Sequence, residues 1–180
     1  MAESAFIVRV AEAEPWVGDL RMRHDPTARL GVPAHITLLY PFMTPERIDA
    51  EVLAQAADVA RRTTPFAFML DRVRRFPRTL YLAPEPADAL IALTRRLAAA
   101  FPDYLPYGGR HPDIVPHLTV AQSDEATIDA AERELETMLA HHGPIDAQGR
   151  AFTLIEQHGG RWKARCDFEL GTSRAPDCSG

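Results

Sequence analysis

The sequence predicts an α+β fold with two lobes, two largely antiparallel sheets, helices on the outside, and pseudo-twofold duplicated lobes around a central cleft. Strand-like segments alternate with amphipathic helical segments, and hairpin turns join some of the strands, which favours antiparallel pairing. The order strand, His-x-Thr strand, helix and hairpin is followed by helix, His-x-Thr strand, helix and hairpin, which is an approximate duplication. A chain of 180 residues can bury a sizeable core and fits one compact domain.

The first segments lead into the first His-x-Thr strand. The apolar run 6–10 predicts a strand, and a helical turn then begins at Pro15, where proline suits the first position. Prolines and a glycine within residues 25–33 break the chain before a strand over 34–40, which Pro41 ends.

A helix and a hairpin follow. The helix begins with Thr44 as its cap and runs to about Arg62, and its apolar residues recur at the helical period: Ile48, Val52, Ala56 and Val59. Residues 66–70 and 79–83 predict two strands, joined by a basic turn over residues 72–78.

The second half repeats this order. Pro86 opens a helix whose apolar stripe consists of Leu90, Leu93, Leu97 and Phe101. A loop over residues 102–116 leads into the second His-x-Thr strand, after which Ser123 or Asp124 caps another helix. Its inward-facing residues are Ile128, Ala131, Leu135 and Met138.

The C-terminal segments predict one more hairpin and a tail. Residues 152–157 and 162–170 are joined by a Gly-rich turn. Residues 1–171 are therefore expected to form a single bilobal domain, and residues 172–180 a disordered tail.

Composition excludes several classes of protein. The net charge of -5 lacks the broad positive field that grips duplex nucleic acid. The N-terminal residues do not resemble a secretory signal, and no apolar run is long enough to span a membrane. Cys166 and Cys178 are too few for a disulfide framework and form a weak zinc motif, so they suit a reducing interior. We expect a cytoplasmic monomer.

Two short segments carry the candidate chemistry. His35-x-Thr37 and His117-x-Thr119 each alternate polar with apolar residues. In a strand this alternation places the histidine and threonine on one face and the apolar residues on the other. Either copy alone could be the solvated side of an ordinary strand, but the pair could bring two imidazoles and two hydroxyls into one cleft.

With their flanks at residues 31–42 and 116–121, the two segments resemble the signature of the 2H phosphoesterases, specifically the 2′-5′ RNA ligase-like family. The resemblance spans roughly residues 6–170. It implies a bilobal α+β fold with the two motifs facing each other across a cleft. It also implies chemistry on cyclic phosphates or 2′,5′-phosphodiesters without a metal or other cofactor.

This chemistry explains why two histidines are needed. Opening a 2′,3′-cyclic phosphate requires one proton to be removed from water and another to be delivered to the departing ribose oxygen. Imidazole can do either near neutral pH. We therefore predict His35 and His117 as acid and base, with Thr37 and Thr119 donating to the phosphate oxygens. His117 is the expected general base and His35 the general acid, although the reverse assignment uses the same geometry.

The loop before the second motif supplies two candidates for substrate binding. Tyr107 could stack on a base, and Arg110 could contact a phosphate. The alternative is a surface loop whose rings cover the helix beneath it. The expected partner is a small nucleotide or an RNA terminus.

Two other functions use the same residues. A nucleotide-binding module would keep the cleft without turnover, but a pure binder does not need two proton-transfer groups. A zinc site could combine His35, His111 and His117, but no well-spaced fourth ligand accompanies them, and the threonines would be unexplained.

Overall fold

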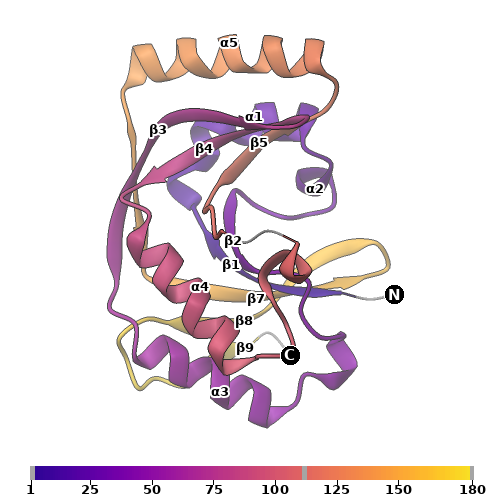
Figure 1. The fold of residues 1–180 in the computed structure, drawn as a ribbon, viewed down its shortest axis with the longest axis vertical. Helices are drawn as coiled ribbons and strands as arrows, with labels where there is room; N and C mark the ends of the chain where they lie inside the picture. The colour runs from indigo at the N-terminus through magenta and orange to yellow at the C-terminus, as the bar shows by residue number, and fades with distance from the viewer. Residues whose placement is uncertain (1–2, 111–112, 179–180) are drawn as a thin grey trace.

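The computed structural model describes residues 3–110 and 113–178 and confirms the α+β class. Two antiparallel sheets form its centre, one of five strands and one of four. They lie between α5 (Glu125–His142) at one end of the long axis and α3 (Ala50–Arg61) at the other (Figure 1).

The five-stranded sheet forms the first lobe. In spatial order its strands are β2 (His35–Leu39), β1 (Ser4–Arg9), β7 (Ala151–His158), β8 (Arg161–Glu169) and β9 (Asp177–Cys178). The helices α3 and α4 (Asp88–Ala100) cover this sheet and contact each other. The predicted stripe of α4 is buried, and aromatic rings fill the interior, with the Phe6 and Phe152 centroids 5.6 Å apart.

The four-stranded sheet forms the second lobe. In spatial order its strands are β5 (Leu118–Gln122), β4 (Thr79–Glu85), β3 (Phe66–Phe76) and β6 (Ile145–Gly149). The helices α1 (Glu14–His24) and α5 contact this sheet and each other. Asp124 caps α5 by accepting a hydrogen bond from the Thr127 amide, which confirms one of the two predicted caps. The short helix α2 (Pro26–Arg29) follows α1, and single 3-10 turns cover Ala11–Ala13, Pro45–Arg47 and Pro106–Gly109.

The two lobes exchange elements, which corrects the expectation that consecutive halves of the chain form them. The hairpin β3–β4 pairs with β5, whereas β7–β8 pairs with β1 beside β2. The helices also cross over: α1 precedes β2 but packs on β5, and α4 precedes β5 but packs on β2. One buried apolar cluster includes residues of both sheets, and we infer from it that the lobes form a single domain.

Two predicted boundaries are wrong for local reasons. The helix expected at Thr44 begins at Ala50, because the Asp49 carboxylate accepts hydrogen bonds from two amides of its first turn. The expected basic turn is mostly strand: β3 continues to Phe76, because Val73 packs against the core while Arg75 pairs with acidic residues of α5. The strand β6 was not predicted at all.

The C-terminal tail also differs from the predicted disorder. The strand β9 pairs with β8, and Cys166 lies directly opposite Cys178. The two cysteines form a disulfide, so they do not support the reducing interior that the sequence suggested. Among the residues that the structure describes, no helix is both long and apolar enough to span a bilayer.

Candidate active site

The two His-x-Thr motifs meet in one cavity of about 650 Å³ at the boundary of the lobes. The edge strands β2 and β5 contact each other there. The lining residues come from both lobes and from the loops between them: Asp25, Thr27, His35, Thr37, Tyr40, Phe76, Pro77, Thr79, Tyr107, Asp113, Val115, His117, Thr119 and Gln122.

Period-2 alternation places the motif side chains in the cavity. Ile36 and Leu38 are buried in β2, while His35 and Thr37 on the other face are partly exposed. In the second motif, Leu118 and Val120 are buried, while His117 and Thr119 are partly exposed. The structure therefore brings all four predicted residues together.

Both imidazoles are oriented by the same backbone contact. Nδ1 of His35 lies 2.8 Å from the carbonyl oxygen of Pro33, and Nδ1 of His117 lies 2.8 Å from that of Val115. A carbonyl oxygen can only accept a hydrogen bond, so Nδ1 carries the proton in each ring. In the neutral rings this leaves Nε2 with a lone pair, which is the arrangement a base requires.

Burial lowers the pKa of both histidines, but a nearby positive charge lowers only that of His35. Burial lowers the pKa of His35 to about 4, and the positive charge of Arg21 is the second cause. Burial also lowers the pKa of His117, and the hydrogen bond to Val115 opposes this shift.

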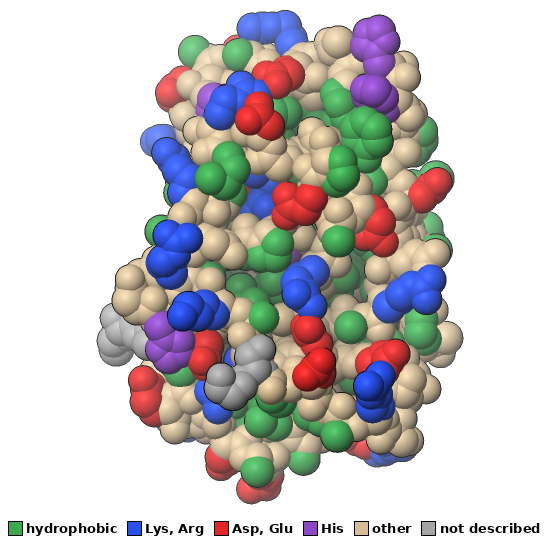
Figure 2. Space-filling view, turned by 180° about the vertical axis from the view of Figure 1, so that it is seen from behind, with side chains coloured by type: hydrophobic (Ala, Val, Ile, Leu, Met, Phe, Trp, Pro, Cys, Tyr) green, Lys and Arg blue, Asp and Glu red, His purple; other side chains and the backbone are tan. Residues whose placement is uncertain are grey.

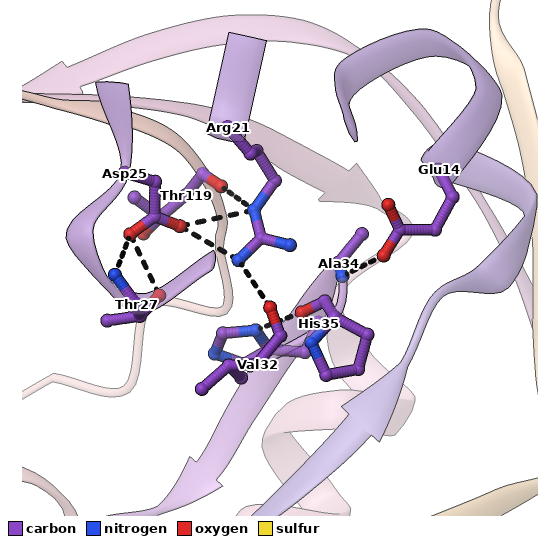
Figure 3. A network of polar contacts seen from close by, with 9 residues as sticks. Glu14, Arg21, Asp25, Thr27, Val32, Ala34, His35 and Thr119 are labelled. Carbon is purple, nitrogen blue, oxygen red and sulfur yellow. Dashed lines mark hydrogen bonds and ion pairs between the residues drawn. The ribbon is translucent and has the colours of Figure 1, made fainter. Parts of the chain in front are cut away.

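A buried ion pair lies beside His35 (Figure 3). Arg21, which is only 2% exposed, donates from Nη2 to Asp25 Oδ2 at 2.8 Å. Its Nε donates to the Thr119 carbonyl at 3.1 Å, and Nη2 also lies 3.3 Å from the Val32 carbonyl. The opposite carboxylate oxygen of Asp25 accepts from the amide and hydroxyl of Thr27.

Sequence reasoning did not identify Arg21 or Asp25. Their i, i+4 spacing is compatible with an ordinary surface pair. Glu14, also on α1, accepts a hydrogen bond of 2.5 Å from the Ala34 amide and so fixes the residue just before β2. Through this hydrogen bond, α1 holds the backbone in place just before the first motif strand.

Aromatic rings surround His117. The centroids of Phe76 and Tyr81 lie 5.1 Å and 5.4 Å from that of the imidazole, both edge-on. The Tyr107 ring stacks on it at 6.0 Å. Of these rings, Phe76 and Tyr107 line the cavity and give it an apolar wall beside a polar centre, as is typical of small-molecule sites.

Tyr107 lines the cavity, whereas Arg110 does not. Tyr107 has φ 53°, its amide donates to the Tyr40 carbonyl at 2.6 Å, and its hydroxyl hydrogen-bonds with Thr37. Burial raises the pKa of Tyr107 to about 12. Arg110 is exposed and is not among the lining residues, but its charge acts on Tyr40, whose hydroxyl donates to Glu3 at 2.7 Å.

The zinc interpretation gains no support. Within residues 3–110 and 113–178, no three His, Cys, Asp or Glu side chains gather as metal ligands, and His111 lies outside the described residues. Figure 2 shows positive side chains interspersed with negative ones over one face of the molecule, which agrees with the low net charge.

Comparison with known proteins identifies the family of this chain. The sequence matches the 2'-5' RNA ligase superfamily over residues 10–161. A Bacillus cereus protein (strain ATCC 10987 / NRS 248) named "Putative phosphoesterase" is 31% identical over 157 residues, covering 84% of this chain and 87% of the relative. A Bacillus pumilus protein of the same name is 29% identical over 160 residues, covering 84% of this chain and 86% of the relative.

Solved structures share the fold. The protein TT0787 of Thermus thermophilus has a TM-score of 0.61 at 18% identity, covering 96% of this chain and all of the other. E. coli LigT complexed with 3'-AMP has a TM-score of 0.59 at 19% identity, covering 94% of this chain and 98% of the other. With the family match extending over most of the sequence, the chain belongs to the 2′-5′ RNA ligase superfamily of 2H phosphoesterases.

Proposed function

We propose that this protein is a metal-independent phosphodiesterase that acts on 2′,3′-cyclic phosphates or on 2′,5′-linked ribonucleotides and RNA termini. One observation carries the proposal. Two imidazoles with identically fixed Nδ1 protons line one cavity, each with a threonine two residues further along the chain. A site that only bound nucleotides would not need this duplicated proton-transfer group.

The proposed reaction uses one imidazole as base and the other as acid. The base removes a proton from water as the water oxygen attacks phosphorus, and the acid protonates the ribose oxygen as its bond to phosphorus breaks. The hydroxyls of Thr37 and Thr119 donate to the non-bridging oxygens, on which charge accumulates. With an RNA hydroxyl attacking the cyclic phosphate in place of water, the same groups would join RNA ends as the ring P–O bond breaks.

The cavity and the related structures support a small substrate. A volume of about 650 Å³ lies within the usual range for small-molecule sites. E. coli LigT has been crystallised with 3'-AMP, with NADP+ and with ATP. We extend this nucleotide preference to the present protein, with Tyr107 as the stacking surface and Arg110 as a contact outside the cavity. Action as a cytoplasmic monomer remains part of the proposal.

The test is turnover of 2′,3′-cyclic nucleotides and 2′,5′-linked dinucleotides, with and without a chelator. His35→Ala and His117→Ala should each lose about 10²–10⁴-fold in rate, the usual contribution of a positioned proton-transfer group. His158→Ala is the matched control, because His158 is exposed at the end of β7 and lies outside the cavity lining.

Each outcome separates the candidate functions. Loss of turnover in both cavity variants, with unchanged circular dichroism and no effect of chelator, supports the two-histidine mechanism. Full activity in either variant contradicts it. Nucleotide binding without turnover in the unmodified protein would instead favour the binding module, and loss of activity with chelator would favour a metal site.

A further inference from the structure

Each motif strand contains a β-bulge directly after its threonine. In β2 the extra residue is Leu38, which follows Thr37 and is left out of the pairing with β1. In β5 the extra residue is Val120, which follows Thr119 and is left out of the pairing with β4. The same irregularity therefore occurs at the same place in both motifs.

The bulge in β5 changes which side chain faces the cavity after Thr119. In a regular strand the next residue on that face would be Ala121. The extra residue shifts the alternation by one, so Val120 and Ala121 are both buried and Gln122 lines the cavity. The second motif thus has a third cavity residue, which follows its threonine after two buried ones.

The bulge in β2 has the same effect, but the residue that it places in the cavity is already engaged. Leu38 and Leu39 are buried, and Tyr40 lines the cavity. The Tyr40 hydroxyl donates to Glu3 at 2.7 Å. The Gln122 side chain, by contrast, has no hydrogen-bond partner among residues 3–110 and 113–178. Its amide is therefore available to a ligand.

A second polar side chain lies directly opposite Gln122. Thr79 of β4 is its partner in the antiparallel pair, and the Cβ atoms of such partners lie about 4.5–5.5 Å apart on the same face. Thr79 also lines the cavity, and its hydroxyl has no hydrogen-bond partner within the part of the chain that the structure describes. Phe76, which pairs with Thr79 at the end of the hairpin, adds an aromatic wall. An amide and a hydroxyl thus lie side by side in the cavity, next to an aromatic ring.

The backbone on both sides of this pair is fixed. β5 runs beside β4, beneath α5 (Figure 1). The Ser123 amide donates to the Arg78 carbonyl at 3.2 Å, and Arg78 Nε donates to the Ser123 carbonyl at 3.3 Å. Asp124 then caps α5. Because the neighbours of both Gln122 and Thr79 are held in this way, little ordering of the backbone is needed when a ligand binds.

Resting on the function proposed above, we propose that Gln122 and Thr79 bind the hydrogen-bonding edge of the substrate's nucleobase and give the site a preference for adenine. Gln122 is then a specificity-determining residue of the second motif. Neither residue was a candidate in the sequence, because only the bulge brings Gln122 onto the face of the His-x-Thr residues.

The chemistry of a primary amide determines which bases fit. An amide offers one N–H donor beside one carbonyl acceptor, and unpaired RNA bases are read on their Watson–Crick and Hoogsteen edges. Adenine places its N6 amino group beside a ring nitrogen acceptor on both edges, so an amide complements either one. Guanine has two adjacent acceptors, O6 and N7, on its Hoogsteen edge, which the acceptor of an amide does not match. Pyrimidines contact a smaller area of the aromatic wall.

The spacing also suits a nucleotide. At about 3.3 Å per residue, Gln122 lies no more than roughly 10 Å along β5 from Thr119. A ribonucleotide whose phosphate contacts Thr119 can therefore bring its base to Gln122 within the same cavity. Tyr107, which lines that cavity as well, contributes stacking for any base, whereas Gln122 distinguishes one base from another.

The first experiment measures affinity by isothermal titration calorimetry and does not require turnover. The probes are the four nucleoside 3′-monophosphates and an abasic ribose 3-phosphate, which lacks the base. The wild type should bind 3′-AMP most tightly. Gln122→Ala should weaken the binding of 3′-AMP about 5–30-fold, within the usual cost of losing a bidentate base contact, and should bind the abasic phosphate as the wild type does. Because Gln122 is exposed, this variant should keep the circular dichroism of the wild type.

Two further variants test the hydrogen-bonding pattern. Gln122→Glu replaces the amide by a carboxylate that only accepts, so it should lose its match to adenine and gain one to the adjacent N1–H and N2–H donors of guanine. The added negative charge weakens the binding of both nucleotides alike, so the expected result is a fall in the affinity for 3′-AMP relative to 3′-GMP. Thr79→Val keeps the shape of the side chain but removes the hydroxyl, and it should weaken the binding of 3′-AMP about 3–10-fold.

Gln148→Ala is the matched control, because Gln148 is an exposed glutamine of the same sheet, in β6, and lies outside the cavity lining. It should bind every probe as the wild type does. Three results would each overturn the proposal: equal affinity of the wild type for all four monophosphates, unchanged affinity of Gln122→Ala for 3′-AMP, or an equal loss of affinity for the abasic phosphate in that variant.

The base subsite and the proposed function can fail separately. If the base preference depends on Gln122 but neither 2′,3′-cyclic nor 2′,5′-linked substrates are turned over, the subsite stands and the proposed function fails. If these substrates are turned over equally well with every base, and equally well by Gln122→Ala, the proposed function stands and the subsite fails.

Discussion

The hydroxyl of Tyr107 hydrogen-bonds with Thr37 inside the active-site cavity, although the two residues are far apart in the sequence and belong to unrelated elements. Tyr107 adopts a left-handed backbone with φ 53°, which is uncommon for a bulky residue and needs support from its surroundings. That support includes the hydrogen bond from its amide to the Tyr40 carbonyl. The loop therefore orients one of the two proposed phosphate-binding hydroxyls.

Tyr107→Phe should lower kcat/KM about 3–10-fold, equivalent to one neutral hydrogen bond. The ring remains and still stacks on His117, so the main loss is the orientation of Thr37. Tyr107→Ala should lose more, mainly through a higher KM, because the stacking surface is removed as well. Steady-state kinetics on a cyclic nucleotide measures both effects.

Tyr104→Phe provides the control in the same loop. The Tyr104 ring packs on Phe42 with centroids 4.9 Å apart and does not line the active-site cavity. Equal losses in Tyr104→Phe and Tyr107→Phe would mean that the loop is merely destabilised. An unchanged kcat/KM in Tyr107→Phe would contradict the role of Tyr107 in orienting Thr37.

The four motif residues could be predicted because their signal is local. Alternation along five or six residues decides which side chains share a face, and no distant contact is needed to read it. His35 and Thr37 therefore lie where the sequence predicted, as do His117 and Thr119. The α4 stripe was predictable for the same reason, since its periodicity is complete within one helix.

Arg21 and the exchange of elements between lobes could not be predicted in this way. The helix α1 packs on β5 and has no single apolar stripe, so nothing in its sequence separates the buried Arg21 from the exposed Arg23. Which sheet receives the hairpin β3–β4 depends on pairing with β5, far along the chain. Such choices are made by long-range contacts rather than by local pattern.

The unpredicted strand β6 offers a test of close strand packing. Gly149 faces the ring of Phe66 on the neighbouring β3, and a Cβ at this position would overlap the ring atoms. Gly149→Ala should therefore lower the free energy of unfolding by about 1–3 kcal/mol, measured by urea denaturation. In the double variant Gly149→Ala/Phe66→Ala, the alanine should cost less than it does alone. An equal cost in both backgrounds would contradict the overlap.

The disulfide should stabilise the fold without affecting catalysis. Cys166 and Cys178 are separated by 12 residues, and closing a loop of about this length contributes up to about 3 kcal/mol. Cys178→Ser should lower the free energy of unfolding accordingly, and reductant should lower that of the wild type but not of the variant. Turnover should be unchanged, because β9 lies at the opposite edge of the sheet from β2. If reductant also lowers the free energy of unfolding of Cys178→Ser, the disulfide is not the cause of the effect seen in the wild type.

The pH dependence of kcat/KM follows from the lowered pKa values of the two histidines. One ring must be neutral to accept a proton, so activity rises as pH increases through the lower of the two pKa values, and burial lowers the pKa of His35 to about 4. The other ring must be protonated to donate, so activity falls as pH increases through the higher of the two pKa values, and burial lowers the pKa of His117 from its usual 6.5. The profile should be bell-shaped, with its maximum between pH 4 and 6.5. In Arg21→Met/Asp25→Leu the acidic limb alone should move to higher pH, because only His35 senses that pair, provided that circular dichroism shows a folded protein at each pH. A maximum above pH 7, or movement of the alkaline limb instead, would contradict this assignment of the limbs.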